Sequence, residues 1–177
     1  MPDATFKLCI FGNGGVGKTT LIQKYISGRF EHQTKMTLGV DILTKRIKMG
    51  EWNVILQIWD FGGEERFRFF LPAYSRGSSG GIYMYDTTRY NTLLDFDEWI
   101  KVFKKGAEYE ENPIPIIMVG GKIDLEEKRV VFFEDAHNFS RERNINDIIE
   151  CSSLTGQNVE LIFSYLTYRI MRDIELI

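Results

Sequence analysis

The segment of residues 11–20 reads FGNGGVGKTT and places four glycines directly before a lysine and two threonines. Gly12 and the run Gly17-Lys18-Thr19 match the pattern G-x-x-x-x-G-K-[ST], which is typical of loops that bind a chain of phosphates. Glycines suit this task because their backbone N–H groups can point at phosphate oxygens without a Cβ in the way. An apolar stretch precedes the segment, and apolar residues at helical spacing follow it over residues 21–26. The sequence therefore predicts a strand, a phosphate-binding loop and a helix, in this order.

Lys18 and Thr19 carry the polar chemistry of this loop. We expect the Lys18 ammonium to reach the β- and γ-phosphates and the Thr19 hydroxyl to bind Mg²⁺. The N-terminus of the following helix would add unsatisfied N–H groups and the positive end of the helix dipole. The competing interpretation is a glycine-rich turn that matches the pattern by chance, and such a turn would need neither the preceding strand nor the following helix.

The rest of the chain alternates between expected strands and expected helices. Strands are expected at residues 40–60 (two strands that turn at Gly50-Glu51), 80–86, 114–120 and 147–153. Helices are expected at residues 96–103, entered through a capping arrangement of Thr92 and Asp95, around residues 131–143, and from residue 159 onward. One short helix is expected in the glycine-punctuated loop after residue 60. This alternation predicts one α/β domain over residues 1–177, with right-handed crossovers between parallel strands.

In such a sheet, ligands bind beyond the carboxyl ends of the strands, where several loops meet. The loops expected to meet there follow Phe11, Asp60, Asp86, Gly120 and Cys151. Asp60 opens the run Asp60-Phe61-Gly62-Gly63, so its carboxylate is expected to hold Mg²⁺ through water while the Gly63 amide meets a γ-phosphate oxygen. Thr37, in a polar loop, is expected to add a second hydroxyl to the metal, unless it simply begins the next strand.

Three stretches carry a resemblance to a known family: TLGVD at residues 37–41, WDFGGEERFR at residues 59–68 and SSLTGQNVELIF at residues 152–163. Together with the phosphate-binding loop, in this order and at these separations, they resemble the Ras superfamily and its Rab-like branch in particular. The similarity covers almost the whole chain. It implies a P-loop GTPase domain with a mostly parallel six-stranded sheet, helices on both faces, and two switch loops that respond to the γ-phosphate.

The resemblance also implies which residues of this chain form the nucleotide site. The nucleotide-binding residues would be Gly14, Gly15, Val16, Gly17, Lys18, Thr19, Thr20, Phe30, Thr37, Gly63, Lys122, Asp124, Ser152, Ser153 and Leu154. The metal ligands would be Thr19, Thr37 and Asp60, and the residues that act in GTP hydrolysis would be Glu64, Lys18, Thr37 and Gly63. Asp124 makes chemical sense by itself, because a carboxylate can accept hydrogen bonds from the N1–H and N2–H of guanine, which adenine cannot supply. The alternatives are a core aromatic at Phe30 and a solvated loop at Lys122 and Asp124.

The chain departs from the family pattern at several positions. Glu64 stands where the family has a glutamine that orients the attacking water, and we expect it to support hydrolysis with an altered pH dependence. Gly121 stands where the family has an asparagine, and the loss of its contacts should weaken guanine-nucleotide binding by about 1–3 kcal/mol and speed nucleotide exchange. Gly62 replaces an alanine, which should leave the second switch less ordered, while Leu154 replaces a lysine and Ile42 an aromatic residue.

The resemblance implies a molecular switch that binds GTP or GDP with Mg²⁺ and hydrolyses GTP slowly without an activating protein. Exchange factors, activating proteins and effectors would bind through two segments, from Thr34 to Val40 and from Phe61 to Arg76. Glu64 and Gly121 leave open a second function, a guanine-nucleotide-binding interaction module with little or no hydrolysis. A P-loop kinase or ATPase that uses adenine is disfavoured by Asp124.

Composition and charge limit which other classes of protein this chain could belong to. The 177 residues are 44% hydrophobic, and 22 basic against 25 acidic residues indicate no basic surface for nucleic acid. Cys9 and Cys151 are expected to be buried thiols, and His32 and His137 ordinary surface or boundary residues. No apolar run reaches the ~20 residues needed to cross a bilayer, and neither end of the chain matches a signal peptide or a lipidation motif. We therefore expect a cytoplasmic protein, with recruitment to membranes through its partners as the route left open.

Overall fold

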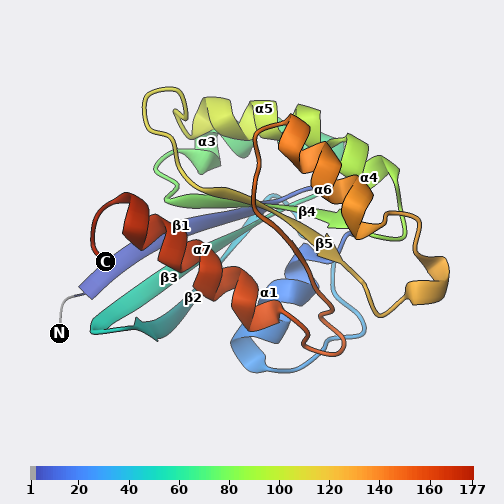
Figure 1. Cartoon of the computed structure of the whole chain (residues 1–177), viewed down its shortest axis with the longest axis horizontal. Helices are drawn as coiled ribbons and strands as arrows, with labels where there is room; N and C mark the ends of the chain where they lie inside the picture. Colours follow the sequence, from blue (N-terminus) through green and yellow to red (C-terminus); the bar gives the residue numbers. More distant parts are fainter. Residues whose placement is uncertain (1–2) are drawn as a thin grey trace.

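The computed structural model describes residues 3–177, and residues 1 and 2 lie outside the described residues. A six-stranded sheet has the strand order β2-β3-β1-β4-β5-β6 (Figure 1). Its strands are β1 (Asp3–Phe11), β2 (Val40–Met49), β3 (Trp52–Phe61), β4 (Gly80–Asp86), β5 (Ile116–Gly121) and β6 (Ile148–Glu150). All neighbouring strands are parallel except β2 and β3, which form an antiparallel hairpin. The predicted α/β fold with a mostly parallel sheet is confirmed.

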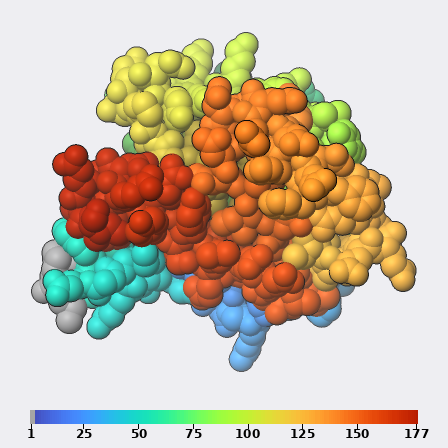
Figure 2. Space-filling model, in the orientation of Figure 1, coloured from blue at the N-terminus to red at the C-terminus, as the bar shows by residue number. Residues whose placement is uncertain are grey.

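Helices cover both faces of this sheet. They are α1 (Lys18–Ser27), α2 (Glu65–Arg68), α3 (Leu71–Ser75), α4 (Asn91–Leu94), α5 (Phe96–Gly106), α6 (Phe133–Glu142) and α7 (Val159–Asp173), with a 3₁₀ turn η1 at Glu126–Lys128. In the space-filling view, side chains of α7 (red) and of the segment around α6 (orange) lie on the side of the molecule that faces the viewer (Figure 2), although these two helices pack on opposite faces of the sheet. Between residues 3 and 177, no helix is both long enough and apolar enough to span a membrane.

The sheet divides the core into two parts. Its central strand β1 contributes side chains to both parts and carries the phosphate-binding loop at its end. Leu8 and Ile10 belong to the part that α1 and α7 cover, whereas Cys9 and Phe11 belong to the part that α3, α5 and α6 cover. This division follows from the strand period of two, which sends successive side chains to opposite faces. The Phe11 ring stacks on Phe103 of α5 with the ring centroids 4.4 Å apart, so the strand end next to the loop is held by close packing.

The expected capping arrangement of Thr92 and Asp95 was wrong. Asp95 precedes α5 with a helical backbone and makes no side-chain capping bond, while Thr92 lies inside α4. The buried Thr92 hydroxyl instead accepts a hydrogen bond from the Asp86 N–H at 2.9 Å and donates one to the Arg89 carbonyl at 2.7 Å. The Thr92 hydroxyl therefore stabilises the turn that follows β4, and it does not cap the N-terminus of α5.

Two other helix expectations need correction. The helix expected around residues 131–143 is shorter and spans Phe133–Glu142, and Val131 precedes it with its N–H bonded to the Thr87 carbonyl at 2.9 Å. The loop after β3 contains two short helices, α2 and α3, where one was expected.

Both cysteines are buried and free, as expected. Burial raises the pKa of Cys9 to about 11 and that of Cys151 to about 12. Both side chains therefore remain neutral thiols at physiological pH and behave as small apolar core residues.

Candidate nucleotide-binding site

The loop after β1 requires glycine where it passes closest to the neighbouring strand. Gly12 has φ +142°, and a Cβ at this residue would lie 2.3 Å from the Met84 carbonyl oxygen of β4. Gly17 has φ +105° and leads directly into α1, which begins at Lys18. The first N–H groups of a helix have no intrahelical partner, so the N-terminus of α1 presents donors to this loop.

Lys18 lies almost completely buried at the centre of the loop. The residue is 6% exposed, and Nζ donates hydrogen bonds to the carbonyls of Gly12 (2.8 Å) and Asn13 (2.9 Å). Burial lowers the pKa of Lys18 to about 8, against the opposing attraction of Asp60. An ammonium that has lost most of its hydration interacts strongly with a phosphate oxygen placed beside it.

Three oxygen-bearing side chains from separate elements meet next to Lys18. Thr19 Oγ1 of α1 lies 2.8 Å from Thr37 Oγ1, and it donates to Asp60 Oδ2 of β3 at 2.5 Å. Asp60 is 1% exposed, and its Oδ1 has no hydrogen-bond partner among the described residues. Burial raises the pKa of the Asp60 carboxyl, although the bond from Thr19 and the charge of Lys18 oppose this shift. Two hydroxyls and a carboxylate with an unused oxygen fit a hard cation such as Mg²⁺.

A cavity of about 470 Å³ opens beside these groups. Of the residues expected from the sequence, it is lined by Gly14, Gly15, Gly17, Lys18, Thr19, Thr20, Thr37, Gly63, Glu64 and Lys122. The buried Asp60 lies beneath Thr19 and does not line the cavity. The structure thus brings together the loop after β1, the segment before β2 and the segment after β3, as the sequence predicts.

The segment after β3 packs directly against the phosphate-binding loop. The Gly63 carbonyl accepts a hydrogen bond from the Gly14 N–H at 3.0 Å, and a Cβ at Gly63 would lie 2.3 Å from that nitrogen. A Cβ at Gly62 would lie 2.7 Å from the Thr37 carbonyl oxygen, so close packing accounts for this glycine. Glu64 lines the cavity, and its Oε2 forms an ion pair with Arg66 Nε at 2.5 Å.

A second cavity, of about 370 Å³, adjoins the first and is mainly apolar. Of the residues expected from the sequence, it is lined by Val16, Gly17, Thr20, Phe30, Lys122, Asp124, Ser153 and Leu154. Gly17, Thr20 and Lys122 line both cavities, so the two form one continuous site. An apolar cavity with one carboxylate on its wall suits a flat heterocycle that carries hydrogen-bond donors at one edge.

Ser152 supports Asp124 from outside this second cavity. It is buried, and its hydroxyl donates to Asp124 Oδ1 at 2.6 Å. This bond fixes the direction of the carboxylate and leaves Oδ2 and the second lone pair of Oδ1 for other donors.

The sequence did not indicate several residues that line the site. Met84, His32 and Leu125 line the second cavity, and His32 packs edge-on against Phe30 with the ring centroids 4.8 Å apart. Met84 could be found only from three-dimensional contacts: a Cβ at Gly121 would lie 2.5 Å from Met84 Cε. The methionine methyl group therefore fills the space beside Gly121. The expected effect of Gly121 on nucleotide exchange stays a prediction.

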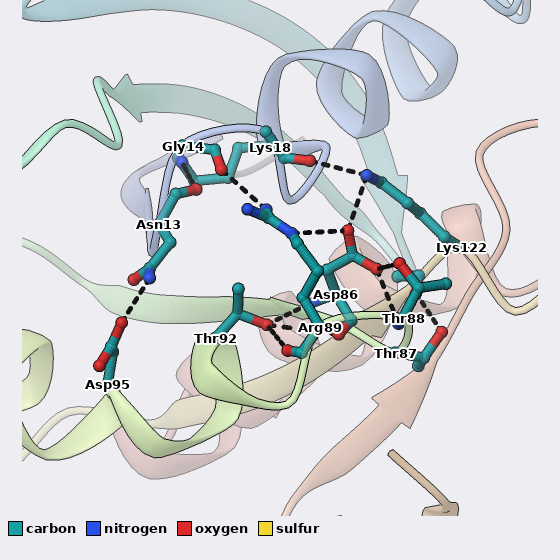
Figure 3. A network of polar contacts seen from close by, with 12 residues as sticks. Asn13, Gly14, Lys18, Asp86, Thr87, Thr88, Arg89, Thr92, Asp95 and Lys122 are labelled. Atoms are coloured by element: carbon teal, nitrogen blue, oxygen red, sulfur yellow. Dashed lines mark hydrogen bonds and ion pairs between the residues drawn. The ribbon is translucent and has the colours of Figure 1, made fainter. Parts of the chain in front are cut away.

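Asp86 and Arg89 form a polar network with Lys122 that the sequence did not indicate (Figure 3). Lys122 Nζ donates to the Gly15 carbonyl at 2.7 Å and forms an ion pair with Asp86 Oδ2, also at 2.7 Å. Burial alone would raise the pKa of the Asp86 carboxyl, but the hydrogen bonds from Lys122 and Thr88 outweigh burial and lower it. The only hint in the sequence was that the loop after Asp86 should meet the others at this edge of the sheet.

Comparison with known proteins finds a family model and individual relatives that match nearly the whole chain. The sequence model described as "Ras: Ras family" matches residues 7–172. Ras-related protein RABA1e of Arabidopsis thaliana is 34% identical over 170 residues, which cover 96% of this chain and 76% of that protein. Ras-related protein Rab11B of Nicotiana tabacum is 36% identical, with the same coverage of 96% and 76%. Ras-related protein Rab-4A of Homo sapiens is 36% identical over 173 residues, which cover 98% of this chain and 78% of that protein.

The matched residues include the loop after β1, both cavities and the segments that surround them. The resemblance seen in residues 37–41, 59–68 and 152–163 is thereby confirmed, together with the similarity to proteins that carry Rab names. The chain belongs to the Ras family, whose members are small GTPases.

Proposed function

We propose that residues 1–177 act as one GTPase domain that binds GTP or GDP with Mg²⁺, hydrolyses GTP slowly and signals through its switch loops. One observation carries this proposal: a polar cavity with a buried lysine adjoins an apolar cavity with a fixed carboxylate. The first suits a magnesium-bound triphosphate and the second suits guanine. Membership of the Ras family supports the same function.

The positions of the residues support the following roles. Lys18, the backbone N–H groups of residues 15–20 and the N-terminus of α1 would bind the phosphates. Thr19, Thr37 and Asp60 would hold Mg²⁺, which neutralises phosphate charge when it is bound. Asp124 would accept hydrogen bonds from guanine, and Phe30 and Leu154 would cover its faces.

The two switch segments would respond to the γ-phosphate through Thr37 and Gly63. Both segments expose large apolar side chains, among them Met36, Leu38, Phe69 and Phe70. Exposed apolar groups beside a nucleotide-dependent loop suit partners that distinguish the GTP form from the GDP form. We propose that exchange factors, activating proteins and effectors bind here, and that such partners recruit the protein from the cytoplasm to membranes.

Glu64 would position the attacking water. It lines the cavity that would hold the phosphates, but its carboxylate is paired with Arg66 in this structure. This ion pair favours a second candidate function, a guanine-nucleotide-binding interaction module with little or no hydrolysis, because an engaged carboxylate is less able to orient water.

Single-turnover hydrolysis of GTP across a range of pH tests the role of Glu64. We expect Glu64→Ala to be about 10- to 100-fold slower than the parent near neutral pH, since a positioned acid or base contributes at least this much. Glu134→Ala, which removes an exposed carboxylate from α6, is the matched control. Identical pH profiles for the parent and Glu64→Ala would contradict this role, and the absence of hydrolysis in both would favour the interaction module.

A further inference from the structure

The Asp86 carboxylate lies at the end of β4 and is surrounded by donors on both of its oxygens. Oδ1 accepts hydrogen bonds from the Thr88 N–H (2.8 Å) and the Thr88 hydroxyl (2.7 Å). Oδ2 accepts from Lys122 Nζ at 2.7 Å and from Arg89 Nε at 3.2 Å. The Asp86 side chain is only 1% exposed, so this charge is fixed in place and poorly screened by water.

The two cations bound to Asp86 each hold one carbonyl of the phosphate-binding loop. Arg89 Nη2 donates to the Gly14 carbonyl at 2.8 Å, and Lys122 Nζ donates to the Gly15 carbonyl at 2.7 Å (Figure 3). We call Asp86, Arg89 and Lys122 the loop clamp. Arg89 itself is anchored, because its backbone N–H bonds to the Asp86 carbonyl and its carbonyl accepts the Thr92 hydroxyl.

The direction of these two carbonyls determines the direction of the N–H groups that follow. In a planar trans peptide, the C=O of one residue and the N–H of the next point to opposite sides. A clamp that draws the Gly14 and Gly15 carbonyls toward Asp86 therefore turns the N–H groups of Gly15 and Val16 away from it. Glycine-rich loops are free to rotate these peptides, so an external restraint has a large effect on them.

Gly121 makes this restraint more important in this chain. It has no side chain to reach the loop, and the space beside it is filled by the Met84 methyl group, which cannot form a strong hydrogen bond. Among the described residues, the side-chain hydrogen bonds to the Gly14 and Gly15 carbonyls come from Arg89 and Lys122.

We propose that Arg89 is a positioning residue that orients the phosphate-binding loop through Asp86 and the Gly14 carbonyl, and so slows the release of bound nucleotide. The inference rests on the proposed function, because it concerns the same site. Arg89 reaches Asp86 with Nε and the Gly14 carbonyl with Nη2, two separate nitrogens of one planar group, whereas a lysine at this position would have to reach both acceptors with its single Nζ. Its side chain is 40% exposed, so we expect a moderate effect.

The test is the release rate of mant-GDP from the full chain, chased with excess GDP in the presence of Mg²⁺. We expect Arg89→Ala to release nucleotide about 3- to 10-fold faster than the parent, and Arg89→Lys to lie between the two. Arg172→Ala removes the same charge from an exposed position on α7 and should match the parent. The thermal midpoint of the nucleotide-free form is measured for each variant, because a positioning role predicts faster release without a matching loss of stability.

Release from Arg89→Ala at the parent rate would overturn the proposal, as would full restoration by Arg89→Lys. Faster release that is matched by an equal loss of stability of the nucleotide-free form would overturn it too. If Arg89→Ala does not fold, the comparison of Arg89→Lys with the parent decides, and equal rates count against the proposal. Failure of the parent to bind mant-GDP at all would instead refute the proposed function, and the inference with it.

Discussion

Replacement of Lys18 by alanine is expected to lower the affinity for GTP and GDP by at least about 100-fold, because charge-assisted hydrogen bonds to phosphate are the strongest polar contacts available to this site. Lys18 is 6% exposed, and the loop carbonyls already hold its ammonium in a fixed position. A fixed and poorly hydrated charge does not have to be reorganised when the phosphates arrive. Isothermal titration of the nucleotide-free protein with GDP and Mg²⁺ measures the effect.

Lys24→Ala is the matched control, since Lys24 lies about 1.7 turns further along α1 and lines neither cavity. It should bind GDP as the parent does. An affinity of Lys18→Ala within about threefold of the parent would contradict the assignment of the first cavity to phosphates.

Replacement of Asp124 by alanine should remove the preference of the protein for guanine. The carboxylate is directed by Ser152, and it would accept from both N1–H and N2–H of guanine. Inosine triphosphate lacks the N2 amino group, so the parent should bind GTP about 10- to 100-fold more tightly than inosine triphosphate. In Asp124→Ala this ratio should fall close to 1, with GTP affinity lowered by at least about 100-fold.

Competition with mant-GDP measures these ratios for each variant. Asp135→Ala removes an exposed carboxylate from α6 and should keep the parent ratio, whereas Ser152→Ala should give an intermediate value because Asp124 loses one restraint. If Asp124→Ala still preferred GTP over inosine triphosphate as strongly as the parent, the second cavity would not be the guanine site assigned to it.

The parts of the site that consist of short sequence motifs were predictable. The phosphate-binding loop directly follows β1, and Asp60 lies at the end of β3. The chemistry of phosphates and Mg²⁺ favours those residue types in that order. The strand pattern likewise predicts a sheet whose carboxyl ends gather these loops. Thr37 was harder to place, because it lies in the long loop between α1 and β2. The structure places its hydroxyl 2.8 Å from that of Thr19.

The contacts that depend on side-chain reach between elements were not predictable. Arg89 and the Gly14 carbonyl are 75 positions apart in the chain, and nothing in the local sequence says that the arginine turns toward the loop. Thr92 resembled a helix cap because its spacing to Asp95 fits one, yet packing against the end of β4 decided its partner. The Met84 methyl group beside Gly121 is a similar case, because a missing side chain leaves space that a distant residue can fill.

Competition between GTP and ATP for the nucleotide-free parent protein, with Mg²⁺ present and mant-GDP as the reporter, tests the central claim most directly. The account predicts that GTP displaces the reporter at a concentration at least about 100-fold lower than ATP does, because only guanine can donate two hydrogen bonds to the Asp124 carboxylate. Displacement by both nucleotides at the same concentration, or by neither, would contradict it.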